Sequence, residues 1–250
     1  MRPSLWSPVP IAVTVVLGVA LGSAGCGAQR QHAQIQRDGE ALRSELAELY
    51  VAKGARQAAA PLLERVIAES PRNARVRVLY GSVLRDLGLY PQAEKELRFA
   101  LRLDGRRADG HDALAILLDL TGRGDEALRH HQRAARLAPS NAEIRNNLGF
   151  ALYLAGRTDE AILHLERALA LDPGLAQAHI NLGFAYGRAG RLAEAERSFR
   201  NALPEASAQH DLALVLDERG DAEGARAARE RAYALDPDLR PDHSVALEAP

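Results

Sequence analysis

Side chains able to do chemistry are few, and they recur at intervals along the chain instead of clustering in one place. His130 and His131 are adjacent, so on a helix they would point to different sides and would not share a metal. The acidic pairs Asp125–Glu126 and Asp159–Glu160 stand 34 positions apart, which indicates a repeated structural role. In the first turn of a helix, such carboxylates suit the positive end of the helix dipole.

Catalytic motifs are missing from the sequence. It contains no phosphate-binding glycine loop, no HExxH zinc motif, no GxSxG nucleophile motif and no CxxC pair. We therefore predict a protein that is not an enzyme, binds no cofactor, metal or small-molecule substrate, and acts by other means. The balance of 33 acidic residues against 32 Lys and Arg argues against nucleic acid as a partner.

The single cysteine, Cys26, follows a basic start and an apolar run at residues 11–21. That run is shorter than the roughly 20 apolar residues that span a membrane, and it is typical of a secretory signal. The segment resembles a bacterial lipoprotein signal, in which the cysteine is lipidated and becomes the mature N-terminus. Ala24 and Gly25 fit that pattern, whereas Ser23 stands where an aliphatic residue is usual.

The resemblance implies a lipoprotein signal peptide at residues 1–25 and attachment to a membrane through a lipid on Cys26. Gly27 stands where some bacteria place an Asp that retains lipoproteins at the inner membrane, so we expect an outer membrane lipoprotein facing the periplasm. Cleavage after Ala28 is the alternative, and it would leave a periplasmic or secreted protein. An uncleaved anchor is a further alternative.

A period of 34 residues organises most of the remaining chain. Its fifteenth position is always glycine and its twentieth is always alanine. The glycines are Gly54, Gly88, Gly122, Gly156, Gly190 and Gly220, and the alanines are Ala59, Ala93, Ala127, Ala161, Ala195 and Ala225. Glycine ends a helix in a left-handed cap without steric clash, and small side chains let two helices approach closely. Each copy is therefore predicted to be a helix, a glycine turn and a second helix.

This pattern resembles the tetratricopeptide repeat family. The resemblance implies an all-α protein, a right-handed superhelical solenoid of about six helix-turn-helix repeats. The fourth position, where the family often has Trp, carries Arg, Gln or His, and we expect His111 and His179 to pack there. The fifth copy is short, and Pro204 is predicted to end its second helix early.

The predicted organisation places a linker at 26–39, the repeat domain at 40–239 and a disordered tail at 240–250. The predicted repeats are 40–73, 74–107, 108–141, 142–175, 176–205 and 206–239.

In this family the first helices line a concave groove that holds a protein or peptide segment. Carried over by position, the expected binding residues are Ile116, Asn146, Asn147, Phe150, Tyr153, Ile180, Asn181, Phe184 and Arg188. Apolar side chains exposed on such a wall indicate a partner, and asparagine amides can hydrogen-bond a peptide backbone.

A lipoprotein signal followed by these repeats resembles bacterial lipoproteins of pilus assembly, of the tight-adherence or the type IV pilotin kind. The resulting hypothesis is a protein–protein interaction scaffold in the bacterial envelope that assists assembly of a pilus or secretion complex. The alternatives are an adaptor for peptidoglycan enzymes or envelope proteases, and a non-catalytic subunit of an enzyme complex.

Overall fold

The computed structural model describes residues 34, 39 and 41–240, and every regular element within them is helical. The predicted all-α fold is confirmed. Across these described residues, no helix combines the length and the apolar character needed to cross a bilayer. The predicted signal peptide, Cys26, Ala28, most of the predicted linker and residues 241–250 lie outside the described residues.

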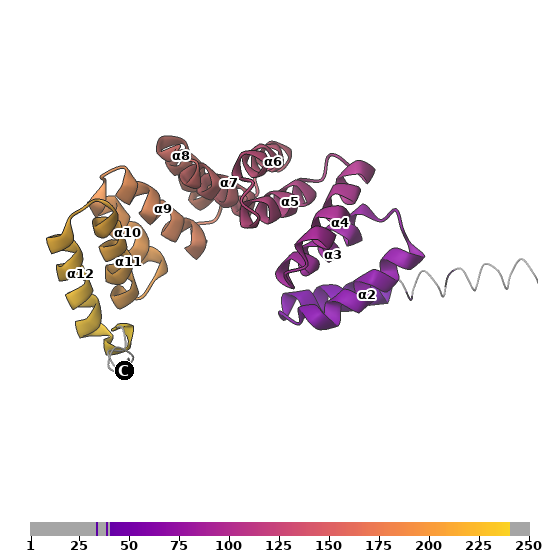
Figure 1. The fold of residues 1–250 in the computed structure, drawn as a ribbon, viewed down its shortest axis with the longest axis horizontal. Helices are drawn as coiled ribbons and strands as arrows, with labels where there is room; N and C mark the ends of the chain where they lie inside the picture. Colours follow the sequence, from indigo (N-terminus) through magenta and orange to yellow (C-terminus); the bar gives the residue numbers. More distant parts are fainter. Residues whose placement is uncertain (1–33, 35–38, 40, 241–250) are drawn as a thin grey trace, which may run out of the picture. The chain divides into compact units, whose positions relative to one another are not determined.

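The helices follow one another in pairs (Figure 1). Residues 41–52 form the helix that precedes α2. The others are α2 (Arg56–Glu69), α3 (Ala74–Asp86), α4 (Tyr90–Leu103), α5 (Ala108–Leu120), α6 (Gly124–Leu137), α7 (Ala142–Leu154), α8 (Thr158–Leu171), α9 (Ala176–Arg188), α10 (Leu192–Ala202), α11 (Glu205–Glu218) and α12 (Ala222–Leu235), followed by the 3₁₀ turn η1 (Pro237–Leu239). From α5 onward, each pair packs as a hairpin, and its second helix also contacts the first helix of the next pair.

The chain divides into two compact units, residues 1–76 and 77–250. In the first unit, Ala47, Ala59 and Leu63 are fully buried, and Arg43 forms an ion pair with Glu69 at the end of α2. The second unit has two apolar clusters. One contains Leu97, Leu114 and Leu118, and the other contains Leu148, Leu165 and Phe199.

Glycine ends the first helix of every pair. The six predicted turn glycines have φ between 73° and 82°, and no other described residue has a positive φ. At Gly88, the N–H donates to the carbonyl of Arg85, and the next N–H, of Leu89, donates to the carbonyl of Leu84, both at 2.9 Å. A side chain would be strained at this left-handed position, which is why the period always places glycine there.

Small residues also set how closely the paired helices cross. A Cβ added at Gly149 of α7 would lie 2.6 Å from Cγ of Leu165 on α8, and one at Gly183 of α9 would overlap the ring of Phe199 on α10. Ala161 and Ala195 are fully buried on α8 and α10. Glycine or alanine at these crossings therefore lets a large residue of the facing helix pack against backbone.

The fifth pair is shorter than its neighbours. α10 has 11 residues, whereas α8 and α12 have 14. Pro204 is the N-cap residue of α11, and Leu203 before it is extended. Since proline has no N–H for a helix interior, the chain passes from α10 directly into α11.

Candidate functional site

The candidate site lies on the first helices of consecutive pairs. α5 contacts α7, α7 contacts α9 and α9 contacts α11. Residues four apart on a helix share a face, and the repeat places equivalent residues on the same face of successive helices. Side chains at equivalent positions therefore form rows that run across these helices, and all nine predicted groove residues lie on α5, α7 and α9.

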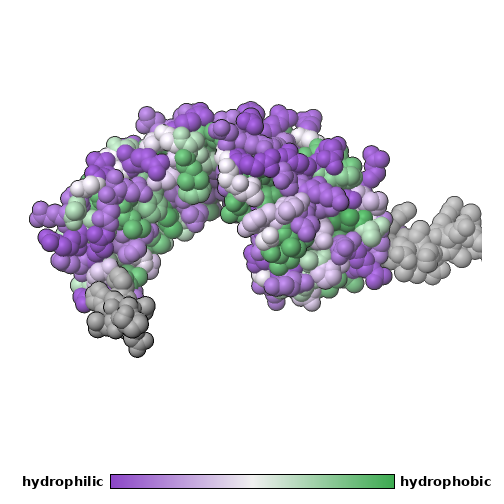
Figure 2. Space-filling model, in the orientation of Figure 1, coloured by the Kyte–Doolittle hydropathy of each residue, from purple (hydrophilic) through white to green (hydrophobic). Residues whose placement is uncertain are grey.

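One row is apolar and reaches solvent. Phe150 is 41% exposed and Leu154, four residues later on α7, is 58% exposed. Figure 2 shows such hydrophobic residues at the surface among hydrophilic ones. We call the full set the apolar ladder; it comprises Ile116, Leu120, Phe150, Leu154, Phe184 and Leu214.

Packing holds the aromatic members of the apolar ladder in place. Phe184 meets the buried ring of Phe199 edge-on, with the ring centroids 5.0 Å apart. Phe150 stacks on Tyr153 at 6.4 Å. Each ring is therefore held by packing against a second ring, while an edge or face remains available for contact.

Sequence reasoning missed three members of the apolar ladder. Leu120 and Leu154 occupy the thirteenth position of their copies, and Leu214 occupies the ninth position of the last copy. The signal was present, since a large apolar residue recurs there in consecutive copies.

A polar row runs beside the apolar ladder. Asn181 of α9 donates through Nδ2 to Oδ1 of Asn146 on α7 at 2.8 Å, and both residues are 6% exposed. Gln177 donates to Asn181 at 3.2 Å, and Asn146 donates to Asn147 at 3.3 Å. Asn147 then donates to Asp112 of α5 at 3.0 Å. The amides thus link three successive first helices through hydrogen bonds to one another.

The polar row ends on a buried histidine. His131 of α6 is 1% exposed, and its ring lies between two carboxylates of α5. Its Nδ1 is 3.2 Å from Oδ1 of Asp112, and its Nε2 is 3.0 Å from Oδ2 of Asp119. Burial by itself lowers the pKa of His131, but the hydrogen bonds and charges of Asp112 and Asp119 outweigh it, so the pKa is raised. In its protonated form, the ring donates to both carboxylates.

Arg188 covers the end of the site on α9. Its guanidinium lies 3.6 Å from the ring centroid of Tyr153, and its Nη1 donates to the Tyr153 carbonyl at 2.6 Å. Burial raises the pKa of the Tyr153 hydroxyl, against the lowering effect of Arg188. This contact ties the C-terminal ends of α7 and α9 together, and the carbonyl to which Arg188 donates belongs to the last turn of α7.

The predicted groove residues lie on α5, α7 and α9 and differ in their exposure. Phe150 and Arg188 are exposed, and Ile116, Asn147, Ile180 and Phe184 are half-buried. Asn146, Tyr153 and Asn181 are buried, and the two asparagine side chains hydrogen-bond to each other. The buried members therefore contribute to packing between the helices, and Phe150 and Arg188 reach solvent.

No group of three or more His, Cys, Asp or Glu side chains in the described part of the chain could hold a metal ion. His130 and His131 do turn to different sides, since His130 contacts His111 whereas His131 contacts Asp112 and Asp119.

Family models for tetratricopeptide repeats match four segments of the chain, residues 50–117, 111–143, 151–190 and 206–231. None of these models describes an enzyme. No curated protein sequence matches the chain significantly.

Solved structures share the fold at low sequence identity. PilW, a widely conserved type IV pilus biogenesis factor, is 18% identical with a TM-score of 0.69, over 83% of this chain and 98% of PilW. PilF of Pseudomonas aeruginosa is 18% identical with a TM-score of 0.65, over 79% of this chain and 92% of PilF. YrrB, a TPR protein with an unusual peptide-binding site, is 20% identical with a TM-score of 0.57, over 71% of this chain and 93% of YrrB.

The helical hairpins, the glycine turns and the four matched segments agree. The chain belongs to the tetratricopeptide repeat family and is built as a protein–protein interaction scaffold.

Proposed function

We propose that this protein is an envelope scaffold that holds a segment of another protein against the first helices of its repeats and assists assembly of a pilus or secretion complex. The observation that carries the proposal is the apolar ladder. Its side chains project from α5, α7, α9 and α11 at equivalent positions, and several of them are about half exposed. A row of large apolar side chains exposed at a protein surface marks a place where a partner binds.

The polar groups around the apolar ladder indicate the chemical character of the partner. Asp112 and Asp119 already pair with His131, and burial raises the pKa of Asp211 on α11. The half-buried Asn147 and the exposed Arg188 add hydrogen-bonding groups at the sides. A segment with apolar side chains flanked by polar ones would satisfy both the apolar ladder and these hydrogen-bonding groups.

A photocrosslinking experiment tests where the partner binds. A photoreactive residue at Phe150 or Leu154 is expected to capture one protein in living cells, to be identified by mass spectrometry. Leu163 on α8 is the matched control, because it is 44% exposed but lies on a second helix. Equal capture of the same protein from Leu163 would contradict binding on the first helices.

Envelope location rests on the sequence around Cys26 and is tested separately. The intact mass of the mature protein is expected to correspond to a chain that begins at a lipidated Cys26. A mass that corresponds to cleavage after Ala28 would contradict lipid anchoring and would support a periplasmic or secreted scaffold.

The likeness to PilW and PilF supports the pilus assignment by fold. Deletion of the gene is expected to reduce piliation or secretin multimers. Unchanged piliation and multimers would contradict this role, and a pull-down that recovers peptidoglycan enzymes or envelope proteases would favour an adaptor for those proteins.

A further inference from the structure

A second surface feature lies away from the apolar ladder, among α4, α5 and α6. It is a pocket of about 490 Å³ lined by Arg98, Leu101, Arg102, Gly105, His111, Leu114, His130 and Arg133. Every ionisable residue that lines it is basic or an imidazole. We call it the arginine–histidine pocket.

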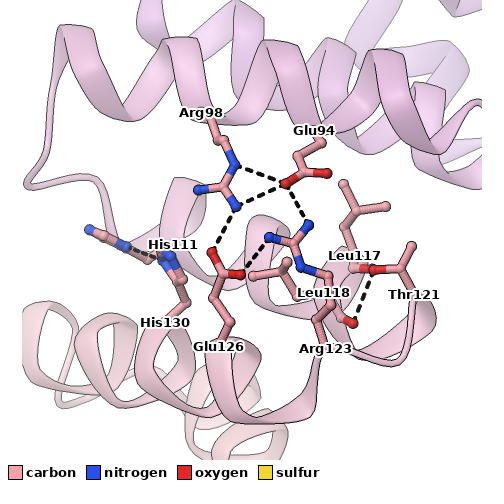
Figure 3. Close-up of polar contacts among 9 residues, drawn as sticks. All are labelled: Glu94, Arg98, His111, Leu117, Leu118, Thr121, Arg123, Glu126 and His130. Atoms are coloured by element: carbon pink, nitrogen blue, oxygen red, sulfur yellow. Dashed lines mark hydrogen bonds and ion pairs between the residues drawn. The ribbon is translucent and has the colours of Figure 1, made fainter.

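The arginines of this pocket differ in how they are neutralised. Arg98 belongs to a closed ring of ion pairs with Glu94, Arg123 and Glu126, in which the four N···O distances lie between 2.5 and 2.8 Å (Figure 3). The two arginines and two glutamates of that ring cancel. Arg102 and Arg133 have no carboxylate of the described residues within ion-pair distance, and Arg102 lies only beside the ring of Phe99. The pocket therefore holds two positive charges that no described carboxylate balances.

Two imidazoles face each other at the wall of the pocket (Figure 3). Nδ1 of His111 and Nδ1 of His130 are 2.8 Å apart, and Nε2 of His111 is 3.2 Å from the carbonyl of Gly105. A carbonyl only accepts, so Nε2 of His111 carries the proton that it donates to Gly105. His111 then accepts at Nδ1 from His130, which leaves Nε2 of His130 without a proton. Protonation at that nitrogen adds a third cationic donor to the pocket without breaking the pair.

The same pocket recurs one copy later with changed residues. A pocket of about 500 Å³ is lined by Gln132, Ala135, Arg136, Pro139, Arg145, Leu148 and His164, which are the positions 34 residues after Arg98, Leu101, Arg102, Gly105, His111, Leu114 and His130. It too is lined by arginine, histidine and leucine, with no acidic residue. One copy earlier, the positions of His111 and His130 hold Arg77 and Glu96, which form an ion pair. Two neighbouring copies thus share a basic lining without acidic residues, which the copy before them lacks.

We propose that the arginine–histidine pocket binds a dianionic oxyanion of the phosphate class. Arg102 and Arg133 would supply the planar guanidinium donors that match its oxygens, and protonated His130 would supply another. Leu101, which is half-buried, gives the pocket an apolar surface on which the carrier of a phosphate ester can rest. A metal fits less well, since only two imidazoles face each other and arginines surround them. This site is separate from the apolar ladder and does not rest on the proposed scaffold function.

Proton uptake should accompany binding, because the groups facing His130 are mostly cationic. They are Arg98 and Arg102 from α4, His111 from α5, and Glu126, Arg129 and Arg133 from α6, whereas Arg136 acts on His111. Burial, followed by the charge of His111 and neighbouring arginines, lowers the pKa of His130 in the free protein. A bound dianion raises that pKa, so binding should strengthen as the pH falls.

Calorimetric titration of the purified protein with sodium sulfate and with inorganic phosphate tests the site. Sulfate stays dianionic over the whole range, so any pH effect belongs to the protein. We expect saturable binding, weakened about tenfold by Arg133→Gln because a charge-assisted hydrogen bond is lost. Sulfate affinity should rise by up to about tenfold per pH unit between pH 7.5 and 5.5, and His130→Gln should remove that rise.

Arg167→Gln is the matched control, because Arg167 stands 34 positions after Arg133 and lines neither pocket. It removes the same charge and should leave sulfate binding unchanged. Equal loss in both variants, no saturable binding, or tight binding of Zn²⁺ alone that depends on His111 and His130 would overturn the proposal. Among supporting outcomes, cosedimentation with phosphatidic acid vesicles that Arg133→Gln abolishes identifies a lipid headgroup. Sulfate binding without cosedimentation identifies a soluble phosphate ester.

Discussion

Asn146 and Asn181 are 35 positions apart in sequence, yet the amide of Asn181 donates to the side-chain oxygen of Asn146 at 2.8 Å in a buried setting. The bond joins the first helices of two successive repeats directly. It is the central link of the polar row that continues through Asn147 and Asp112 to His131. Because these hydrogen bonds form only when the side chains are aligned, the polar row selects one register between neighbouring repeats.

Removal of one partner of this bond should destabilise the protein. Asn146→Leu leaves the amide of Asn181 buried and unsatisfied, with an expected loss of about 1–3 kcal/mol in the free energy of unfolding. Urea unfolding measures this loss, and the dependence of the unfolding free energy on urea concentration should stay unchanged. The double variant Asn146→Leu/Asn181→Leu should lose less than the sum of the two single variants. Asn201→Leu on the exposed face of α10 is the control and should change stability by less than about 0.5 kcal/mol.

The stabilising effect of His131 should depend on pH. Its pKa is raised from 6.5 in the folded state, so its contribution is fully present below pH 6.5 and is lost as the pH rises through the folded pKa. The stability difference between the natural protein and His131→Gln should therefore be larger at pH 6 than at pH 9. Thermal unfolding across this range measures it, and a difference that grows with pH would contradict the Asp112–His131–Asp119 bridge.

His164 provides the opposite case on α8. Burial lowers the pKa of His164, with Arg145 and Arg167 adding to the effect, so the folded protein favours its neutral form. Its contribution is present above pH 6.5 and is lost as the pH falls. His164→Gln should therefore reduce the loss of stability on acidification, whereas His131→Gln should reduce the loss on alkalinisation. The same direction in both variants would show that a general effect of charge dominates.

Gly183→Ala should destabilise the α9–α10 hairpin, because the added methyl would overlap the buried ring of Phe199. Overpacking of this kind costs about 1–3 kcal/mol. Gly124→Ala at the start of α6 is the control, since its Cβ would meet nothing within 4 Å. It should be neutral or stabilising by up to about 1 kcal/mol through helix propensity. Denaturant midpoints of the two variants distinguish a packing effect from a backbone effect.

Polar substitution of the apolar ladder should separate binding from folding. Phe150→Ser and Leu154→Ser are expected to abolish capture of the partner while leaving the helical circular dichroism signal unchanged, because both side chains are largely at the surface. Leu163→Ser removes a similarly exposed apolar side chain from α8 and should preserve capture. Loss of capture in all three variants would point to general damage to the surface.

The periodic sequence determined the helical hairpins, their glycine turns and the face on which the apolar ladder lies. These features follow from local rules: glycine at a left-handed turn, small residues where helices cross, and a fixed spacing that repeats the same face. Ile116, Phe150 and Phe184 could be named in advance for this reason.

Only the tertiary structure decided which polar residues of that wall are buried and with whom they pair. Asn146 and Asn181 were expected to face a peptide, yet both are buried and their side chains hydrogen-bond to each other. His131 between two aspartates, and His111 against His130, depend on side chains from different helices whose distances a single sequence does not contain. Local periodicity sets the helices and their faces, whereas hydrogen bonds, burial and pKa depend on the packing of one repeat against the next.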